Sequence, residues 1–286
     1  MKKNAILIDS SFGIKNNQYA NVYVVPMEII ETAKAKTISY LDQVDIFNAQ
    51  ICEKIDSGVD IKTSQPILGS VVEMVEKLTK EYEHIYALTI PSTISGTHNT
   101  WKMLENEYKT LKVYDQTMVG RLSEWTIVDL LKAESEGKLD DAFITNYLSN
   151  VKDKRAAVLI VPDVSQLKKG GRVSNFKSIL IKMFGLKLII TLDKSGLLFR
   201  NKASKPDETI KRAQDALADL IPLNHSQINR FIVFTNSHAN KKFNIDQYLE
   251  ILKTFYPNIK IEYAELPSVI TAHVGPNFFA FGMDLE

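Results

Sequence analysis

Strand-like and helix-like patterns alternate along most of the chain, and this alternation limits the possible folds more than any other feature. Short apolar runs predict strands at residues 5–8, 85–90, 111–114, 156–161, 186–192, 197–202, 230–235 and 260–265. Amphipathic segments predict helices at residues 66–81, 97–108, 118–136, 140–151, 174–184, 206–220 and 245–255. Strands joined through helices favour an α/β fold with mainly parallel sheets flanked by helices.

The length of the chain favours two domains. A chain of 286 residues, of which 45% are hydrophobic, can build more than one core. We place the boundary near Asp153, which gives an N-terminal α/β domain of residues 1–153 and a C-terminal α/β domain of residues 154–286. Residues 193–196 (Asp-Lys-Ser-Gly) predict a hairpin turn in the second domain. Residues 28–50 are polar and weakly periodic, and they give no clear prediction.

Charge and composition exclude several classes of function. The net charge of +1, from 35 basic and 34 acidic residues, gives no strong attraction to nucleic acid or to anionic membranes. No apolar run is long enough for an integral membrane segment, and the first residues lead directly into a strand, so we expect a cytoplasmic protein. The single cysteine, Cys52, excludes internal disulfides and zinc sites with several thiolates. We expect no metal and no cofactor.

A turn rich in hydroxyl groups lies between a predicted strand and a predicted helix at residues 90–98 (Ile-Pro-Ser-Thr-Ile-Ser-Gly-Thr-His). The first N–H groups of a helix have no partner within the helix, so they favour an anion. Gly96 allows close approach of the backbone, and Ser95 and Thr97 add hydroxyl donors. The alternative is that Ser95 simply caps the helix.

A second turn of this kind lies upstream, at residues 62–66 (Lys-Thr-Ser-Gln-Pro). Ser64 is a plausible N-cap there, and Pro66 fits the first turn of the following helix. Because ligands of open α/β sheets bind at the carboxyl edge of the strands, we expect both turns to meet at one edge of a parallel sheet.

Two further segments carry candidate binding residues. The basic, glycine-rich loop at residues 168–175 contains Arg172, whose guanidinium suits a phosphate or a carboxylate. A solvated surface turn capped by Ser174 explains this loop equally well. His273 follows a strand-like run and precedes a Gly-Pro turn, which suits a functional histidine, although a lone histidine is more often structural.

Common catalytic and nucleotide-binding motifs do not occur in the sequence. It contains no Walker-type loop, no G-x-G-x-x-G and no G-x-S-x-G. A serine-type hydrolase using Ser95 and His273, with an acid such as Asp9, is an alternative function, although the spacing of these residues gives it no specific support. A sugar- or phosphate-binding regulatory module that uses Arg172 is a third reading.

Taken together, these stretches resemble the DegV family of fatty-acid-binding proteins, which includes the acyl-carrying subunits of bacterial fatty acid kinase. The resemblance spans nearly the whole chain and depends on the order and spacing of five pieces. These are Ile-Leu-Ile-Asp-Ser at 6–10, Lys-Thr-Ser-Gln-Pro at 62–66, Ser-Thr-Ile-Ser-Gly-Thr at 92–97, Leu-Lys-Lys-Gly-Gly-Arg-Val-Ser at 167–174 and Ala-His-Val-Gly-Pro at 272–276.

The resemblance implies a two-domain carrier, not an enzyme, that buries one long-chain fatty acid in a lipid pocket at the domain interface. By the same resemblance, Thr63 and Ser95 hold the carboxylate, with Ser64, Gly96 and Thr97 in the same turns. His273 and Arg172 lie near the head group or on the surface that faces the catalytic subunit of a fatty acid kinase. We expect the tail between the first sheet and its helices, and a role in phospholipid synthesis.

The chain departs from the usual family pattern at Pro91, Leu188 and Asn277. Thr63 and Ser95 are retained, so lipid binding is still expected. The departures concern the match to a particular kinase partner.

Overall fold

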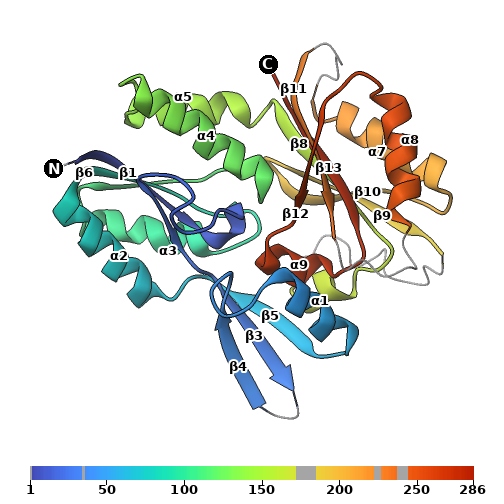
Figure 1. Ribbon diagram of the computed structural model, residues 1–286, viewed down its shortest axis with the longest axis horizontal. Coiled ribbons are helices and arrows are strands. Elements are labelled where there is room, and N and C mark those ends of the chain that lie inside the picture. The colour runs from blue at the N-terminus through green and yellow to red at the C-terminus, as the bar shows by residue number, and fades with distance from the viewer. Residues whose placement is uncertain (1, 34–35, 172–184, 222–226, 237–243) are drawn as a thin grey trace.

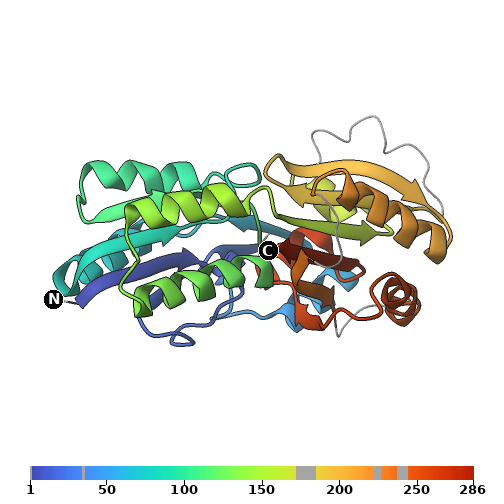
Figure 2. The ribbon, with the colours of Figure 1, turned by 90° about the horizontal axis from the view of Figure 1, so that it is seen from above.

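The computed structural model describes residues 2–33, 36–171, 185–221, 227–236 and 244–286. Two main sheets lie next to each other along the long axis of the molecule (Figures 1 and 2). The first is a four-stranded parallel sheet in the order β2 (Val22–Val25), β1 (Lys2–Asp9), β6 (Tyr82–Leu88) and β7 (Leu111–Tyr114). The predicted α/β class and the parallel sheet are confirmed in this half.

Helices cover both faces of the parallel sheet. The helices α2 (Leu68–Glu81) and α3 (Thr97–Met103), with the short 3-10 turn η2 (Leu104–Asn106), pack on one face. The helices α4 (Arg121–Ser135) and α5 (Asp141–Val151) and the 3-10 turn η1 (Ser10–Phe12) pack on the other. Successive strand residues point to opposite faces, so β1 sends Leu7 to the first core and Ile8 to the second.

The second sheet has six strands, in the order β10 (Gly196–Ala203), β9 (Lys187–Asp193), β8 (Arg155–Val161), β13 (Phe279–Leu285), β11 (Ile228–Thr235) and β12 (Ile261–Glu265). The pairing of β11 with β12 is parallel, and the other four pairings are antiparallel. The expectation of mainly parallel sheets therefore fails in this half. One of the four is the β9–β10 hairpin, which was predicted, and another is the pairing of β8 with β9. The remaining two involve β13, which was not predicted and which runs antiparallel to both of its neighbours.

One face of the six-stranded sheet carries α7 (Pro206–Ala218) and α8 (Ile245–Phe255), which bury a core rich in aromatic side chains. The other face points toward the first half of the molecule and toward α6 (Ser165–Lys169) and α9 (Ser268–Val274). The predicted helix at 174–184 and Arg172 lie outside the described residues. Within the described ranges, no helix is long and apolar enough to cross a membrane.

A third, antiparallel sheet takes two of its three strands from residues 28–50, the stretch that gave no clear prediction. It consists of β4 (Lys36–Leu41), β3 (Glu28–Ala33) and β5 (Asp60–Ser64). The helix α1 (Asn48–Asp56) lies between β4 and β5 in the chain. Its strands bury few apolar side chains, which explains the weak pattern. Both α1 and β5 contact α9 of the C-terminal half, so contacts cross the boundary proposed near Asp153, which stays a prediction.

Candidate functional site

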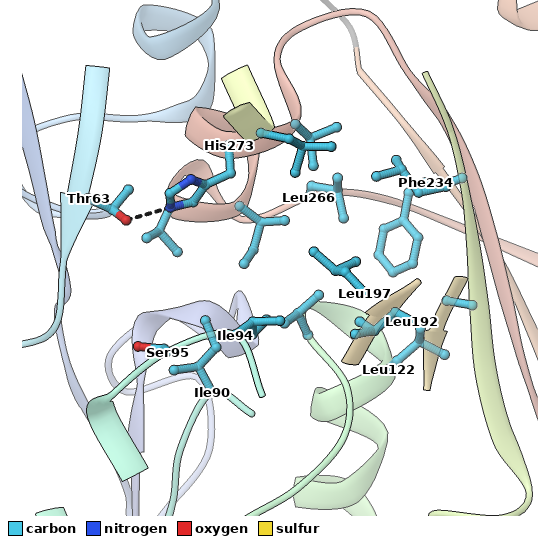
Figure 3. A pocket seen from close by; sticks show the side chains of 18 of the residues that line it. Thr63, Ile90, Ile94, Ser95, Leu122, Leu192, Leu197, Phe234, Leu266 and His273 are labelled. Atoms are coloured by element: carbon cyan, nitrogen blue, oxygen red, sulfur yellow. Dashed lines mark hydrogen bonds between the residues drawn. The ribbon is translucent and has the colours of Figure 1, made fainter. Parts of the chain in front are cut away.

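An apolar cavity lies between the two halves of the molecule (Figure 3). One of its walls is the face of the six-stranded sheet that points away from α7 and α8. The cavity has a volume of about 90 Å³. Three of its twenty lining residues are polar, namely Thr63, Ser95 and His273. The others are Met27, Ile90, Ile94, Val119, Leu122, Ala157, Val158, Leu159, Leu167, Leu192, Leu197, Phe234, Leu266, Val269, Ile270, Val274 and Ala280.

The polar residues gather at one end of the cavity. In Figure 3, Thr63, Ser95 and His273 lie on one side, and Leu122, Leu192 and Phe234 lie on the side away from Thr63. Such a space, apolar over most of its length and polar at one end, suits an amphiphile with a long tail.

Thr63 and His273 are in direct contact although 210 residues separate them in sequence. Oγ1 of Thr63 lies 2.6 Å from Nε2 of His273 and forms a hydrogen bond with it. Thr63 is held in β5 by its pairing with Ile29 of β3, and His273 lies in the last turn of α9. The contact of β5 with α9 therefore positions this pair.

Gly170 fits closely against the other side of the histidine ring. A Cβ atom at position 170 would lie 2.2 Å from Nδ1 of His273, closer than any side chain allows. Glycine is thus required here for close approach and not for its backbone conformation. The segment that begins the basic loop therefore touches the cavity's polar end, while Arg172 itself is outside the described residues.

Ser95 lies in the turn between β6 and α3. Its Oγ is 2.9 Å from Oγ1 of the fully buried Thr97, and it accepts the Thr97 N–H at 3.3 Å. The capping alternative is thus partly right, because Ser95 satisfies an N–H at the start of α3, although Gly96 is the N-cap residue. A Cβ atom at Gly96 would meet nothing within 4 Å, so the space next to this turn is open.

The structure corrects three predictions about these residues. Ser64 ends β5 and does not cap a helix, because Pro66 disfavours helical backbone at the preceding residue and α2 begins only at Leu68. Thr63 therefore belongs to the small antiparallel sheet and not to an edge of the parallel sheet. His273 lies on a helix; its β-branched neighbours made the segment resemble a strand.

The position of the apolar space also differs from the prediction. The spaces between the first sheet and its helices are filled by two buried clusters of side chains. The cavity is instead lined by β8, β9, β10, β11 and β13 of the second sheet, together with α4, α9 and the turn after β6. Sequence reasoning missed this wall because its apolar residues have the same pattern as ordinary core residues.

The hydrolase alternative gains no support from the geometry. A nucleophilic serine needs a hydrogen bond to its base, whereas the Ser95 hydroxyl bonds Thr97 and Nε2 of His273 bonds Thr63. The Asp9 carboxylate accepts the backbone N–H groups of Ser11 and Ile90, at 2.9 and 2.6 Å. Burial raises the pKa of Asp9 to about 6, and these hydrogen bonds oppose that rise.

The described residues also contain no cluster of three or more histidine, cysteine, aspartate or glutamate side chains that could hold a metal ion. The candidate site is therefore the apolar cavity with its hydroxyl and imidazole end.

Comparison with known proteins connects this geometry to a family. A family model described as an uncharacterised protein of the DegV family matches residues 3–285. A DegV domain-containing protein of Mycoplasma genitalium is 28% identical over 292 residues, which cover 99% of each chain.

Two solved structures share the fold over almost their full length. The first is a fatty acid binding DegV family protein from Streptococcus agalactiae, with a TM-score of 0.83 and 22% identity, covering all of both chains. The second is a stearic acid-binding protein from Eubacterium ventriosum, with a TM-score of 0.79 and 16% identity, covering 100% of this chain and 98% of that one. At these identities the likeness establishes the fold.

Proposed function

The chain belongs to the DegV family, and on this premise we propose that it binds one long-chain fatty acid in the cavity described above. The observation that carries the proposal is the distribution of polarity: the cavity is aliphatic except for Thr63, Ser95 and His273 at one end. Structural relatives with the same fold are described as binding fatty acids, which supports the same class of ligand here.

The carboxylate is placed by this proposal at the polar end, where hydroxyl groups can donate to it. Thr63 and Ser95 donate their hydroxyl hydrogens, and His273 holds Thr63 in place through their 2.6 Å hydrogen bond. Thr97 positions Ser95 in turn, and Gly96 leaves open space beside it. Ser64, next to Thr63, and Arg172, outside the described residues, stay as predicted contacts.

The tail supplies most of the affinity in this scheme. Burying fifteen methylene groups at about 0.8 kcal/mol each contributes on the order of 12 kcal/mol, against an association cost of about 4 to 15 kcal/mol. Hydrogen bonds to a charged head group contribute only about 1.5 to 3 kcal/mol each. Thr63 and Ser95 therefore chiefly orient the ligand and avoid an unsatisfied buried carboxylate.

Native mass spectrometry of protein purified from a bacterial host tests the proposal. We expect an adduct with the mass of a long-chain fatty acid, and Thr63→Val should lower its occupancy several-fold by removing one donor. Thr32→Val is the matched control, because Thr32 is an exposed threonine of the same small sheet. A wild-type chain that takes up no fatty acid, even when lipid is added, would overturn the proposal.

We further propose that the chain presents the bound carboxyl group to the catalytic subunit of a fatty acid kinase and performs no chemistry alone. The open space beside Gly96 and the contact of Gly170 with His273 put the polar end close to the surface loops. The acyl phosphate formed there would serve phospholipid synthesis. Incubation of the chain with ATP and oleate, without a second protein, should yield no acyl phosphate. Formation of acyl phosphate in that mixture would contradict the carrier role.

A further inference from the structure

The far wall of the cavity is one face of the six-stranded sheet, where strand pairing arranges the side chains in rows. Leu159 of β8 is paired with Ala280 of β13, and two residues further along Ala157 is paired with Gly282. Partners in antiparallel strands point to the same face, so these two rows lie next to each other at the cavity. Apart from Leu159, these two rows carry the smallest side chains of the wall.

Large side chains flank this small-residue centre. Leu192 of β9 is the partner of Ala157, and Phe234 of β11 is the partner of Ala280. Both large side chains line the cavity on the side away from Thr63 (Figure 3). The two alanines thus form the floor of a recess between Leu192 and Phe234.

Leu122, in the first turn of α4, closes the end of this recess. A Cβ atom at Gly282 would lie 2.8 Å from Cδ1 and 3.1 Å from Cδ2 of Leu122, so the leucine side chain rests on bare backbone. Nη1 of Arg155 donates a hydrogen bond to the Leu122 carbonyl oxygen at 2.8 Å. The position of Leu122 is therefore fixed from both sides.

Charged groups lie immediately beyond Leu122. The next row of the same face pairs Arg155 with Asp284, and their side chains form a buried ion pair with Nη2 3.1 Å from Oδ2. An apolar tail that reached this row would separate charged groups from their partners, which is costly in a buried environment. The apolar space therefore ends at Leu122.

From this arrangement we infer that Leu122, Ala157 and Ala280 set the length of the tail that the cavity accepts. The inference rests on the proposed function and adds to it the residues that select among fatty acids. Leu122 acts as the stop, and the two alanines provide the last stretch of space before it. A larger side chain at either alanine shortens that space, and a smaller one at position 122 extends it toward Arg155.

A competition experiment tests the inference. The purified chain is stripped of lipid and incubated with an equimolar mixture of saturated fatty acids from lauric to arachidic acid, and the bound masses are read by native mass spectrometry. Leu122→Ala should shift the preferred tail upward by about two carbon atoms, because about three carbon-sized groups leave the end wall. Ala280→Leu adds a similar volume and should shift the preference downward by about the same amount.

Two further variants keep the result decisive. Ala142→Leu makes the same change as Ala280→Leu at an exposed position of α5, and it should leave the distribution of bound tails unchanged. Ala157→Val is a milder change in the recess and replaces Ala280→Leu if thermal unfolding shows that variant to be unfolded.

The possible failures are distinguishable. A wild-type chain that binds none of the acids contradicts the proposed function itself. A wild-type chain that binds them, with folded Leu122→Ala and Ala157→Val variants that keep its tail distribution, overturns the assignment of these residues and leaves the proposed function standing.

Discussion

The two faces of the six-stranded sheet use the same strands, yet one is a solid core and the other contains a cavity. On β13, Phe279, Phe281 and Met283 point into the core under α7 and α8, whereas Ala280 and Gly282 point to the opposite side. The pleat of a strand sends neighbouring residues to opposite faces, so one strand can serve both purposes. The space between the two halves is therefore widened by small side chains at alternate positions of β13.

The largest expected effect comes from truncating the same residue type on each face. Phe281→Ala on the solid face should lower the free energy of unfolding by about 3 to 5 kcal/mol, because it leaves a new void in a filled core. Phe234→Ala on the cavity face should cost about 1 to 2 kcal/mol less, because it widens a space that already exists. Urea denaturation of both variants measures the difference. Equal losses would mean that the two faces are packed alike.

A second prediction concerns the charged row that ends the cavity face. Asp284 is buried between Arg155 and Arg230, and its hydrogen bonds to both include one of 3.1 Å from Arg155. Asp284→Asn should lower the free energy of unfolding by about 3 kcal/mol, because the buried Arg155 and the half-buried Arg230 then share the more exposed Asp129. The exposed Asp219→Asn serves as control and should change stability by less than about 0.5 kcal/mol. A loss no larger than the control's would show that water already screens this cluster.

A third effect appears only as pH rises, and it concerns the elements that cover the cavity. Burial raises the pKa of Asp42 to about 7, although the side chains of Ser10, Ser268 and Gln43 lower it in part. Ser268 is the first residue of α9, which lines the cavity, and the nearby Asp9 also has a raised pKa. Protonation of Asp9 and Asp42 therefore affects the stability of the elements that cover the cavity face. The core under α7 and α8 contains neither carboxyl group.

The direction of this pH effect follows from the raised pKa values. Unfolded aspartates lose their protons near pH 3.9, whereas folded Asp9 and Asp42 keep theirs until about 6 and 7. The free energy of unfolding should thus fall as pH rises from about 4 to about 7, and then level off. Asp42→Asn should be more stable than wild type by up to about 4 kcal/mol at pH 8 and nearly equal to it at pH 4. Parallel stability curves for the two proteins across this range would contradict the assignment.

The sequence predicted most of the regular elements but not β13, the strand that contributes large side chains to one face of the sheet and small ones to the other. The strand at 111–114 and the helix at 245–255 agree with β7 and α8 residue for residue, because each has a clear period and clear ends. β13 was missed because small residues alternate with large ones, which dilutes its apolar signal. Its antiparallel insertion between β8 and β11 depends on long-range pairing, which local propensity does not encode.

Within the candidate site, the hydroxyl end was more predictable than the wall. Ser95 belongs to a turn whose hydroxyl groups and glycine are evident in the sequence. Thr63 was predicted as a contact of the carboxylate from the family resemblance. The bond between Thr63 and His273 depends on a small sheet, two of whose strands lie in the stretch that gave no clear prediction. No local pattern distinguishes Leu192 or Phe234 from core residues, although the Phe-Ala-Phe-Gly-Met sequence of β13 is a signal that could have pointed to a one-sided cavity.

The alternation along β13 also determines which kinds of genetic change this protein can tolerate. A substitution at Ala280 alters one position on one face, but inserting or deleting a single residue at the start of the strand moves every later side chain to the opposite face. Phe281 would then occupy the cavity, and alanine and glycine would face α7 and α8. In this strand, a shift of one residue would remove the cavity and the opposite core together.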